Sequence, residues 1–349
     1  MQFANVGRWS LLLVSTLEVA ACRSDLPVEP ATSAVFSLNS PSVTLTDLGT
    51  LGGSASMANA INQDGAIVGN STTGNGETHA FLWRDGTMND LGTLGGSYSS
   101  ATGINPDGAI VGVSYTTGDA ALHAVLWRKG TLTDLGTLGG SYSAALAINP
   151  DGAIVGESYT TDDAEQHAVQ WRNGTLTDLG TLGGSFSSAA SINPDGTIVG
   201  ASLTTNDAEQ HAVLWQGDTV TDLGTLGGMF SAATGINPAG AIVGANTTSG
   251  INPKHAVLWR HGNVTDLGTL GGTFSSAFGI NPAGTIVGQS STTGLTPKYP
   301  VLWRNGTIID LGTLGGFGGA AKAINPAGVI VGFSRTLSND FHATRWSIK

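Results

Sequence analysis

The chain repeats itself with a nearly fixed period, and this repetition limits the folds that it can adopt. The heptapeptide Asp-Leu-Gly-Thr-Leu-Gly-Gly occurs seven times, 43 residues apart once and 44 residues apart thereafter. Its copies begin at Asp47, Asp90, Asp134, Asp178, Asp222, Asp266 and Asp310. Repeats of about 40 to 50 residues are typical of propellers and solenoids, in which each copy is one structural unit that packs on its neighbours.

Turn sequences divide each copy into four short segments. In one copy, Pro106-Asp107-Gly108 and Arg128-Lys129-Gly130 are tight-turn sequences, with proline and glycine at positions that favour their backbone angles. The segments around them are expected to be strands at residues 100–105, 109–112, 123–127 and 131–135. The third segment, His-Ala-Val-Leu-Trp, is apolar on both faces, so both faces must be covered. Each copy is therefore predicted to be an antiparallel sheet that needs no helix.

The two ends of the repeat array complement each other. Residues 43–48 match a fourth strand without a sheet before it, and residues 342–346 match a third strand without a fourth strand after it. An open solenoid needs polar caps, whereas a ring closes when the first strand completes the last unit. The sequence predicts an all-β fold for residues 43–349: a seven-bladed β-propeller of four-stranded antiparallel blades, with the N-terminal strand completing the last blade.

Three motifs recur in these copies: His-Ala-Phe-Leu-Trp at residues 79–83, Asp-Leu-Gly-Thr-Leu-Gly-Gly, and Ile-Asn-x-x-Gly-x-Ile-Val-Gly. Together they resemble the HAF-type extracellular repeat of bacteria, and the resemblance covers residues 43–349. Tyr299-Pro300 and Thr344-Arg345 depart from the motif near the expected closure. The resemblance implies secretion and repetition, and the family offers no catalytic residues to carry over.

The N-terminal residues 1–21 have the pattern of an export signal peptide. Arg8 precedes an apolar stretch, which ends in the small residues Val19-Ala20-Ala21 before Cys22. This ending resembles a bacterial lipobox, in which the cysteine is lipidated, although Glu18 fits that motif poorly. The alternative is cleavage by ordinary signal peptidase close to the same place.

Residues 22–42 are expected to be a lipid-attachment cysteine followed by a flexible tether, because they contain three prolines and several serines and threonines without a sustained period. No later stretch reaches the roughly 18 apolar residues of a membrane span. We therefore expect an exported protein of the cell envelope or exterior, attached to a membrane only through Cys22.

Composition excludes several classes of partner and site. Acidic residues outnumber basic residues 25 to 14, for a net charge of −11, so nucleic acid is an improbable partner. A single cysteine allows no internal disulfide and no thiolate zinc site.

Histidine recurs at one position of the repeat, which could suggest a metal site. The six histidines are His79, His123, His167, His211, His255 and His342, with Tyr299 at the remaining position. Each belongs to a different copy, so the imidazoles are expected to be too far apart to converge on one ion. Polar groups that recur by symmetry normally form hydrogen bonds. We therefore expect structural pairs with the repeated aspartates, and no metal.

No catalytic motif stands out in the chain. It lacks a nucleophile elbow of the form Gly-x-Ser-x-Gly with matched partners, and it lacks a phosphate-binding Gly-x-x-x-x-Gly-Lys. The Leu-Gly-Gly steps are interpreted as turn glycines. We expect no enzyme and no cofactor, with two alternatives: a polysaccharide-active hydrolase or lyase that uses axial residues such as Lys322 or Asn59, and a purely structural envelope protein.

The longer connections of the repeat carry the candidate ligand-binding residues. An aromatic residue follows Leu-Gly-Gly-x in five copies, at Tyr98, Tyr142, Phe186, Phe230 and Phe274. Acidic residues recur in the loops between the second and third strands, among them Asp119, Asp163 and Asp207. The rings could stack on a sugar or grip a peptide. Their repetition favours the other interpretation, packing between blades, and the acids match a solvated rim better than a calcium loop.

The sequence thus predicts a monomeric, non-enzymatic binding module for an extracellular protein or glycan, with these eight residues as its candidate site.

Overall fold

The computed structural model describes residues 42–249, 253–294 and 297–348. They contain 28 strands and three short 3-10 turns, which confirms the all-β prediction. The described residues include no helix that is long and apolar enough to cross a membrane. The predicted export signal, Cys22 and most of the predicted tether lie outside the described residues.

The strands recur at four positions of the repeat. The first position holds β2 (Gly52–Ile61), β6 (Gly95–Ile104), β10 (Gly139–Ile148), β14 (Gly183–Ile192), β18 (Ser231–Ile236), β22 (Gly271–Ile280) and β26 (Gly315–Ile324). The second holds β3 (Ile67–Thr73), β7 (Ile110–Thr116), β11 (Ile154–Thr160), β15 (Ile198–Thr204), β19 (Ile242–Thr247), β23 (Ile286–Thr292) and β27 (Ile330–Thr336). The third holds β4 (Thr78–Arg84), β8 (Leu122–Arg128), β12 (Gln166–Arg172), β16 (Gln210–Gln216), β20 (Lys254–Arg260), β24 (Lys298–Arg304) and β28 (Phe341–Ile348). The fourth holds β5 (Thr87–Asp90), β9 (Thr131–Asp134), β13 (Thr175–Asp178), β17 (Thr219–Asp222), β21 (Asn263–Asp266), β25 (Thr307–Asp310) and, at the start of the chain, β1 (Val43–Asp47).

Strands of one copy pair in antiparallel order, as β6, β7, β8 and β9 do. Isolated parallel bridges, such as Leu122 with Tyr142, connect one copy to the next. The pairing therefore runs through three sheets of 4, 16 and 8 strands. The strand β1 pairs antiparallel with β28, from Val43 opposite Ile348 to Asp47 opposite Thr344.

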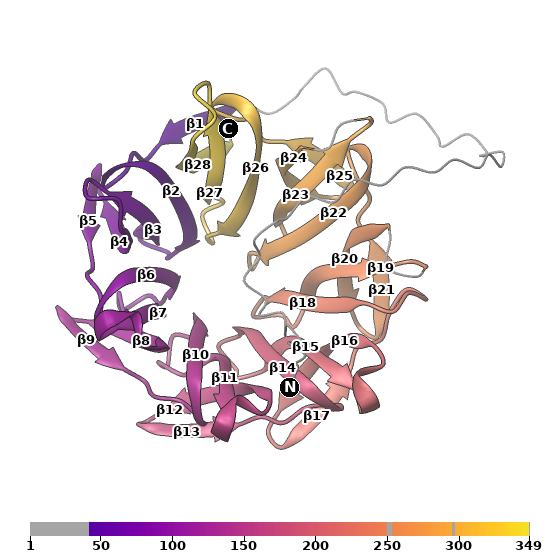
Figure 1. Ribbon diagram of the computed structural model, residues 1–349. Coiled ribbons are helices and arrows are strands. Elements are labelled where there is room, and N and C mark those ends of the chain that lie inside the picture. Colours follow the sequence, from indigo (N-terminus) through magenta and orange to yellow (C-terminus); the bar gives the residue numbers. More distant parts are fainter. Residues whose placement is uncertain (1–41, 250–252, 295–296, 349) are drawn as a thin grey trace, which may run out of the picture. The chain divides into compact units, whose positions relative to one another are not determined.

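Within residues 42–348, the copies follow one another around a ring, with the first strands toward its centre and the fourth strands outside (Figure 1). A ladder of asparagine side chains supports this order. Asn62 donates from Nδ2 to the carbonyl oxygen of Asn105 at 3.4 Å, and Asn105 does the same to Asn149 at 3.5 Å. Asn325 donates to the carbonyl oxygen of Asn62 at 3.2 Å, which joins the last copy to the first.

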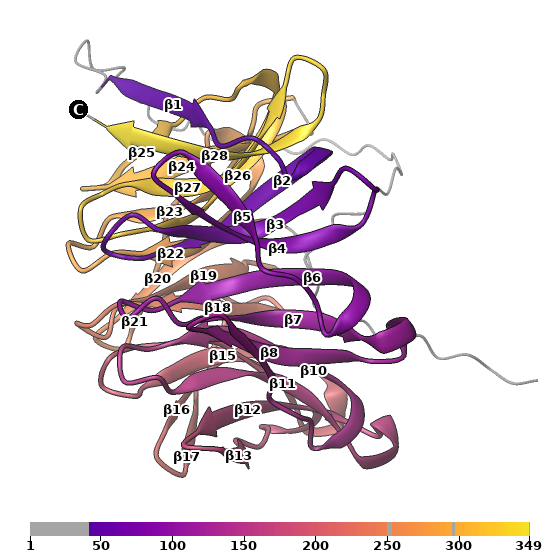
Figure 2. The same cartoon turned by 90° about the vertical axis from the view of Figure 1, so that its left-hand side faces the viewer.

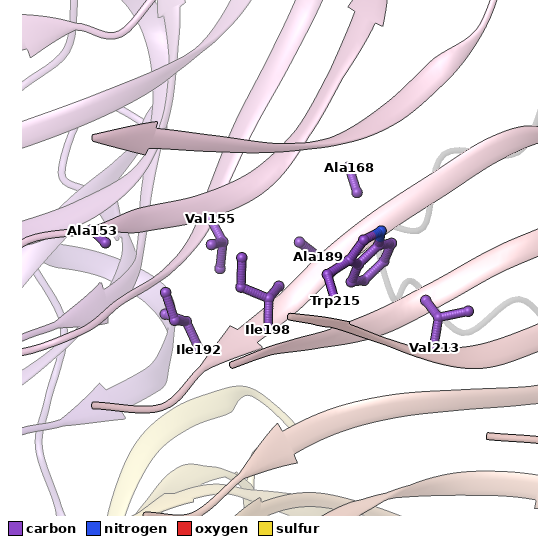
Figure 3. Packing of buried hydrophobic residues seen from close by; sticks show 8 residues of the cluster. All are labelled: Ala153, Val155, Ala168, Ala189, Ile192, Ile198, Val213 and Trp215. Atoms are coloured by element: carbon purple, nitrogen blue, oxygen red, sulfur yellow. The ribbon is translucent and has the colours of Figure 1, made fainter. Parts of the chain in front are cut away.

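The core lies between neighbouring sheets rather than inside one sheet. One cluster combines Val155 of β11 with Ile198 of β15 and Trp215 of β16 (Figure 3). The third strand faces two such clusters, because Ala168 packs in this one while Val169 packs in the preceding one. Both faces of the third strand are therefore covered, as its apolar sequence predicts.

Two of the predicted turns form as expected, but the first strand is longer than predicted. Gly108 has a φ of 78°, and Lys129 and Gly130 have φ values of 52° and 78°. These two positive angles are the geometry of a two-residue hairpin whose twist matches that of its strands. The interpretation of the Leu-Gly-Gly glycines as turn residues before a strand at residues 100–105 was wrong, because β6 already begins at Gly95.

The glycines of Leu-Gly-Gly extend the first strand because they remove steric barriers. Gly95 adopts a φ of 97°, and a Cβ on Gly96 would collide with Asp119 and Tyr115. The register then shifts twice, between Gly95 and Ser99 and between Ala101 and Gly103. Tyr98, the aromatic residue after Gly95 and Gly96, consequently lies inside β6.

Candidate functional site

Alternation of strand direction gives the ring two faces. The turn face carries the Asn-Pro-x-Gly turns and the two-residue hairpins. The loop face carries the connections from second to third strands and from fourth to first strands. The side view in Figure 2 shows these connections projecting from opposite sides. All eight residues of the predicted site lie toward the loop face.

The three predicted aspartates fasten loops to strands. Asp119 ends the 3-10 turn η1 (Thr117–Asp119) and accepts hydrogen bonds from Ser97, at 2.7 Å from the amide nitrogen and 2.8 Å from Oγ. The same pair of bonds recurs in η2 (Thr161–Asp163) and η3 (Thr205–Asp207). It joins Asp163 to Ser141 and Asp207 to Ser185.

These hydrogen bonds also change the pKa of the aspartate carboxyls. The amide and hydroxyl of Ser97 stabilise the carboxylate of Asp119 and so lower its pKa, and Ser141 lowers the pKa of Asp163 in the same way. A carboxylate that already accepts two hydrogen bonds has reduced capacity for an external ligand. The aspartates thus position the loops.

The five predicted aromatic side chains are half-buried in five successive copies, four of them within first strands and Phe230 directly before β18. Each bridges to the third strand of the copy before it, as Tyr98 does opposite Thr78. The ring of Tyr98 meets that of Tyr115 edge to face at 5.8 Å. Lys254 places its Nζ 4.1 Å from the centre of the Phe230 ring, and Lys298 lies 4.0 Å from Phe274. Each of the three aspartates therefore bonds to the serine that directly precedes an aromatic residue in the sequence. The five rings themselves belong to five different copies.

A buried carboxyl that the sequence reasoning missed lies beside one of these rings. Glu157 of β11 is 2% exposed, and Tyr142 donates its hydroxyl to Glu157 Oε1 at 2.7 Å. Burial raises the pKa of Glu157. The signal was available in the repeat, because the equivalent positions hold Asn70, Val113, Ala201, Ala245, Gln289 and Phe333.

Exposed apolar side chains on the loop face were also missed. Phe317 is 73% exposed and Leu337 is 87% exposed, and Leu337 lies against Gly315 in the same copy. Met229, at the position equivalent to Phe317, is 49% exposed. Other copies hold small hydroxyl residues there: Ser54, Ser97, Ser141, Ser185 and Thr273. Comparison of the copies at this position would have found the departure.

The axis of the ring holds a cavity of about 260 Å³ toward the turn face, lined by first-strand residues of all seven copies. Its lining includes Asn59 and Lys322, which the enzyme alternative singles out. Asn59 donates its side-chain amide to the carbonyl oxygen of Ala101 at 2.8 Å, so it joins neighbouring copies. Lys322 places its Nζ 4.3 Å from the centre of the Phe278 ring, and burial lowers its pKa to about 8.

The repeated histidines form the expected pairs with aspartate. Nδ1 of each of the six lies 2.6 to 2.7 Å from an aspartate Oδ2, and the pair of His342 with Asp47 connects the two ends of the described array. Two of the repeated tryptophans bond to backbone instead: the indole nitrogens of Trp127 and Trp171 donate to the carbonyl oxygens of Leu91 and Leu135, each at 2.9 Å. Among the residues that the structure describes, no three His, Cys, Asp or Glu side chains are grouped to hold a metal ion.

Similarity to known proteins is limited to the fold. No protein-family model matches the sequence, and no curated protein matches it either. The β-propeller domain of the Trilobed protease from Pyrococcus furiosus aligns with a TM-score of 0.56 at 12% identity, over 84% of this chain and 97% of that domain. A putative TolB from Agrobacterium tumefaciens aligns with a TM-score of 0.50 at 14% identity, over 75% of this chain and 94% of that chain.

TolB from Acinetobacter baumannii is also similar, with a TM-score of 0.44 at 17% identity, but the alignment covers 58% of this chain and only 50% of that protein. The alignments with TM-scores of 0.56 and 0.50 show a shared all-β, propeller-type architecture, and at 12% and 14% identity they carry no function with them.

Proposed function

We propose that residues 43–349 form a seven-bladed β-propeller of four-stranded antiparallel blades, and that it is the non-enzymatic binding module of an exported, lipid-anchored protein of the cell surface. The antiparallel pairing of β1 with β28 supports closure by the N-terminal strand. The bond from Asn325 to Asn62 supports a ring, because it spans 263 residues of sequence. Export and attachment at Cys22 rest on the N-terminal sequence.

The observation that carries the binding proposal is the pair of exposed apolar side chains in one copy, Phe317 and Leu337. Large apolar side chains that remain in water and gather on one face are typical of contact surfaces. In three other copies this part of the face is built from hydroxyl and acidic side chains that bond to one another, as Ser97 and Asp119 do. The departure from the repeat thus lies where a partner can reach it.

A protein partner fits this surface better than a glycan does. The centres of protein interfaces are more apolar than the rest of the surface and are enriched in aromatic side chains. The five half-buried rings are less suited to sugar stacking, because Tyr98 contacts Tyr115 and Phe230 lies beneath Lys254. Replacing these rings would also disturb the packing between copies, so they make poor test positions.

The test returns Phe317 to the residue that four other copies carry. The full chain and its Phe317→Ser/Leu337→Ser variant are screened against arrays of cell-envelope proteins and glycans, and each hit is measured by surface plasmon resonance. We expect a protein hit whose affinity falls at least tenfold in the variant, while Phe317→Leu, which keeps an apolar side chain, retains most of it. Hits that bind both proteins equally, or glycan hits alone, would contradict the proposed surface.

A further inference from the structure

The axial cavity contains a charge that the rest of its wall does not balance. At the position of the first strand that faces the axis, the seven copies hold Asn59, Thr102, Leu146, Ala190, Thr234, Phe278 and Lys322. Among the residues that line the cavity, Lys322 is the only one with a titratable side chain. The remainder of the lining is dominated by isoleucines, alanines and glycines. One cation therefore faces an otherwise uncharged space.

Lys322 has an aromatic neighbour and, among the described residues, no carboxylate in a salt bridge with it. Its Nζ lies 4.3 Å from the centre of the Phe278 ring and 5.8 Å from that of Phe333. A ring face compensates a desolvated ammonium only partly. Burial without a carboxylate disfavours the charged form, which agrees with the lowered pKa.

The other polar side chains of the wall are mostly engaged. The hydroxyl of Thr102 lies 2.7 Å from the carbonyl oxygen of Ala145, and that of Thr234 lies 2.9 Å from the carbonyl oxygen of Ala277. Asn59 donates its amide to Ala101. A ligand would therefore find one ammonium and few further donors. This set suits a monoanion and would leave a phosphate dianion undercompensated.

We propose that the axial cavity binds a small monocarboxylate with an apolar body, whose carboxylate pairs with the ammonium of Lys322 and whose body packs against Phe278 and the surrounding isoleucines. The volume of about 260 Å³ lies just below the range of drug-sized pockets, so the ligand is small. The site is separate from the loop face and is independent of the proposed protein contact.

Benzoate is the probe, and benzyl alcohol is its neutral counterpart. Titrations of the full chain by calorimetry at pH 7 are expected to show benzoate binding at least tenfold more tightly than benzyl alcohol. Lys322→Met removes the charge and keeps the length of the side chain, and it is expected to weaken benzoate at least tenfold. Lys298→Met is the matched control, since Lys298 also lies over a ring, that of Phe274, but outside the cavity. It should bind benzoate as the unaltered chain does.

The pH profile of the unaltered chain keeps the test decisive if a variant fails to fold. Benzoate affinity should fall as the pH rises through about 8, because the ammonium of Lys322 then loses its proton. Absence of benzoate binding, equal affinity for benzyl alcohol, equal affinity in Lys322→Met, or tighter binding of inorganic phosphate than of benzoate would each overturn the proposal.

Discussion

At the scale of the residue, the repeated glycine of Ile-Val-Gly is a steric requirement. In each copy the first and second strands approach so closely at this point that a side chain has no room. A Cβ built on Gly112 would collide with the carbonyl oxygen of Ser100, and the same collision recurs at the equivalent glycines. Backbone atoms cannot turn aside as a flexible side chain can, so the strands themselves would have to separate.

Gly112→Ala is therefore expected to lower the free energy of unfolding by about 3 kcal/mol or to prevent folding. Gly103→Ala is the matched control, because two neighbouring copies already carry Ala60 and Ala147 at that position. A Cβ there would meet Val111 Cγ2 at 3.1 Å, which a small shift can relieve. Urea denaturation of both variants checks the prediction, and equal stability of the two would show that the close approach is not a constraint.

A second prediction at this scale concerns the imidazole of His167. Its Nδ1 lies 2.7 Å from Asp178 Oδ2, and its Nε2 lies 2.9 Å from Glu165 Oε2. The hydrogen bond with Asp178 raises the pKa of His167 most, burial opposes it, and Glu165 adds a smaller increase. Because the folded pKa is raised, this stabilisation is complete below the unfolded value of about 6.5 and is lost as the pH rises through the folded pKa.

Glu165→Gln should accordingly lower the pKa of His167 in an NMR titration. It should also cost roughly 0.5 kcal/mol of unfolding free energy near pH 5.5 and almost nothing at pH 9, since Glu165 is largely exposed. His123 is the internal control, because its copy has Ala121 in place of the glutamate. A cost that is the same at both pH values would contradict a charge-based role for Glu165.

At the scale of the element, the sequence identifies the strands well where local chemistry decides. Glycine at Gly108 and Gly130 marks turns, and the doubly apolar Ala168-Val169 pair marks a strand covered on both faces. These features depend on residues that lie next to one another. The strand bounds are harder to predict, because β6 starts at Gly95 through its pairing with Thr116 on the adjacent strand.

The candidate site is predicted less completely than the strands, because it also depends on contacts between residues far apart in the sequence. The sequence places Tyr98 and Asp119 on one face, yet their burial and their bonds depend on Tyr115 and Ser97 across the sheet. The predicted site consists of residue types that recur in several copies. The departures, such as Phe317 and Glu157, are visible only when each position is compared around the ring.

At the scale of the whole molecule, the strand that pairs the start of the described array with its end is held differently from its equivalents. Leu45 of β1 packs against the cluster that contains Trp346, as Leu132 of β9 does against Trp127. The strand β9 is anchored at both ends, by the two-residue turn after β8 and by Leu135, whose amide donates to Ala124. In the described part of the chain, β1 has such an anchor only at its far end, where Leu48 donates to Ala343.

Leu45→Ala and Leu132→Ala therefore each remove a half-buried leucine from equivalent strands. The strand β9 is held at both ends, whereas β1 is held at one. Each should cost about 1 to 2 kcal/mol of local stability, less than a fully buried leucine. A weakened β1 can separate from β28 starting at the end that has no hairpin turn, whereas the short turn keeps β9 close to β8. Hydrogen exchange should thus accelerate at least tenfold at the amides of β28 in Leu45→Ala, and much less at those of β8 in Leu132→Ala. Equal acceleration at the two sites would mean that the β1–β28 pairing is no weaker than an internal one and does not limit the integrity of the ring.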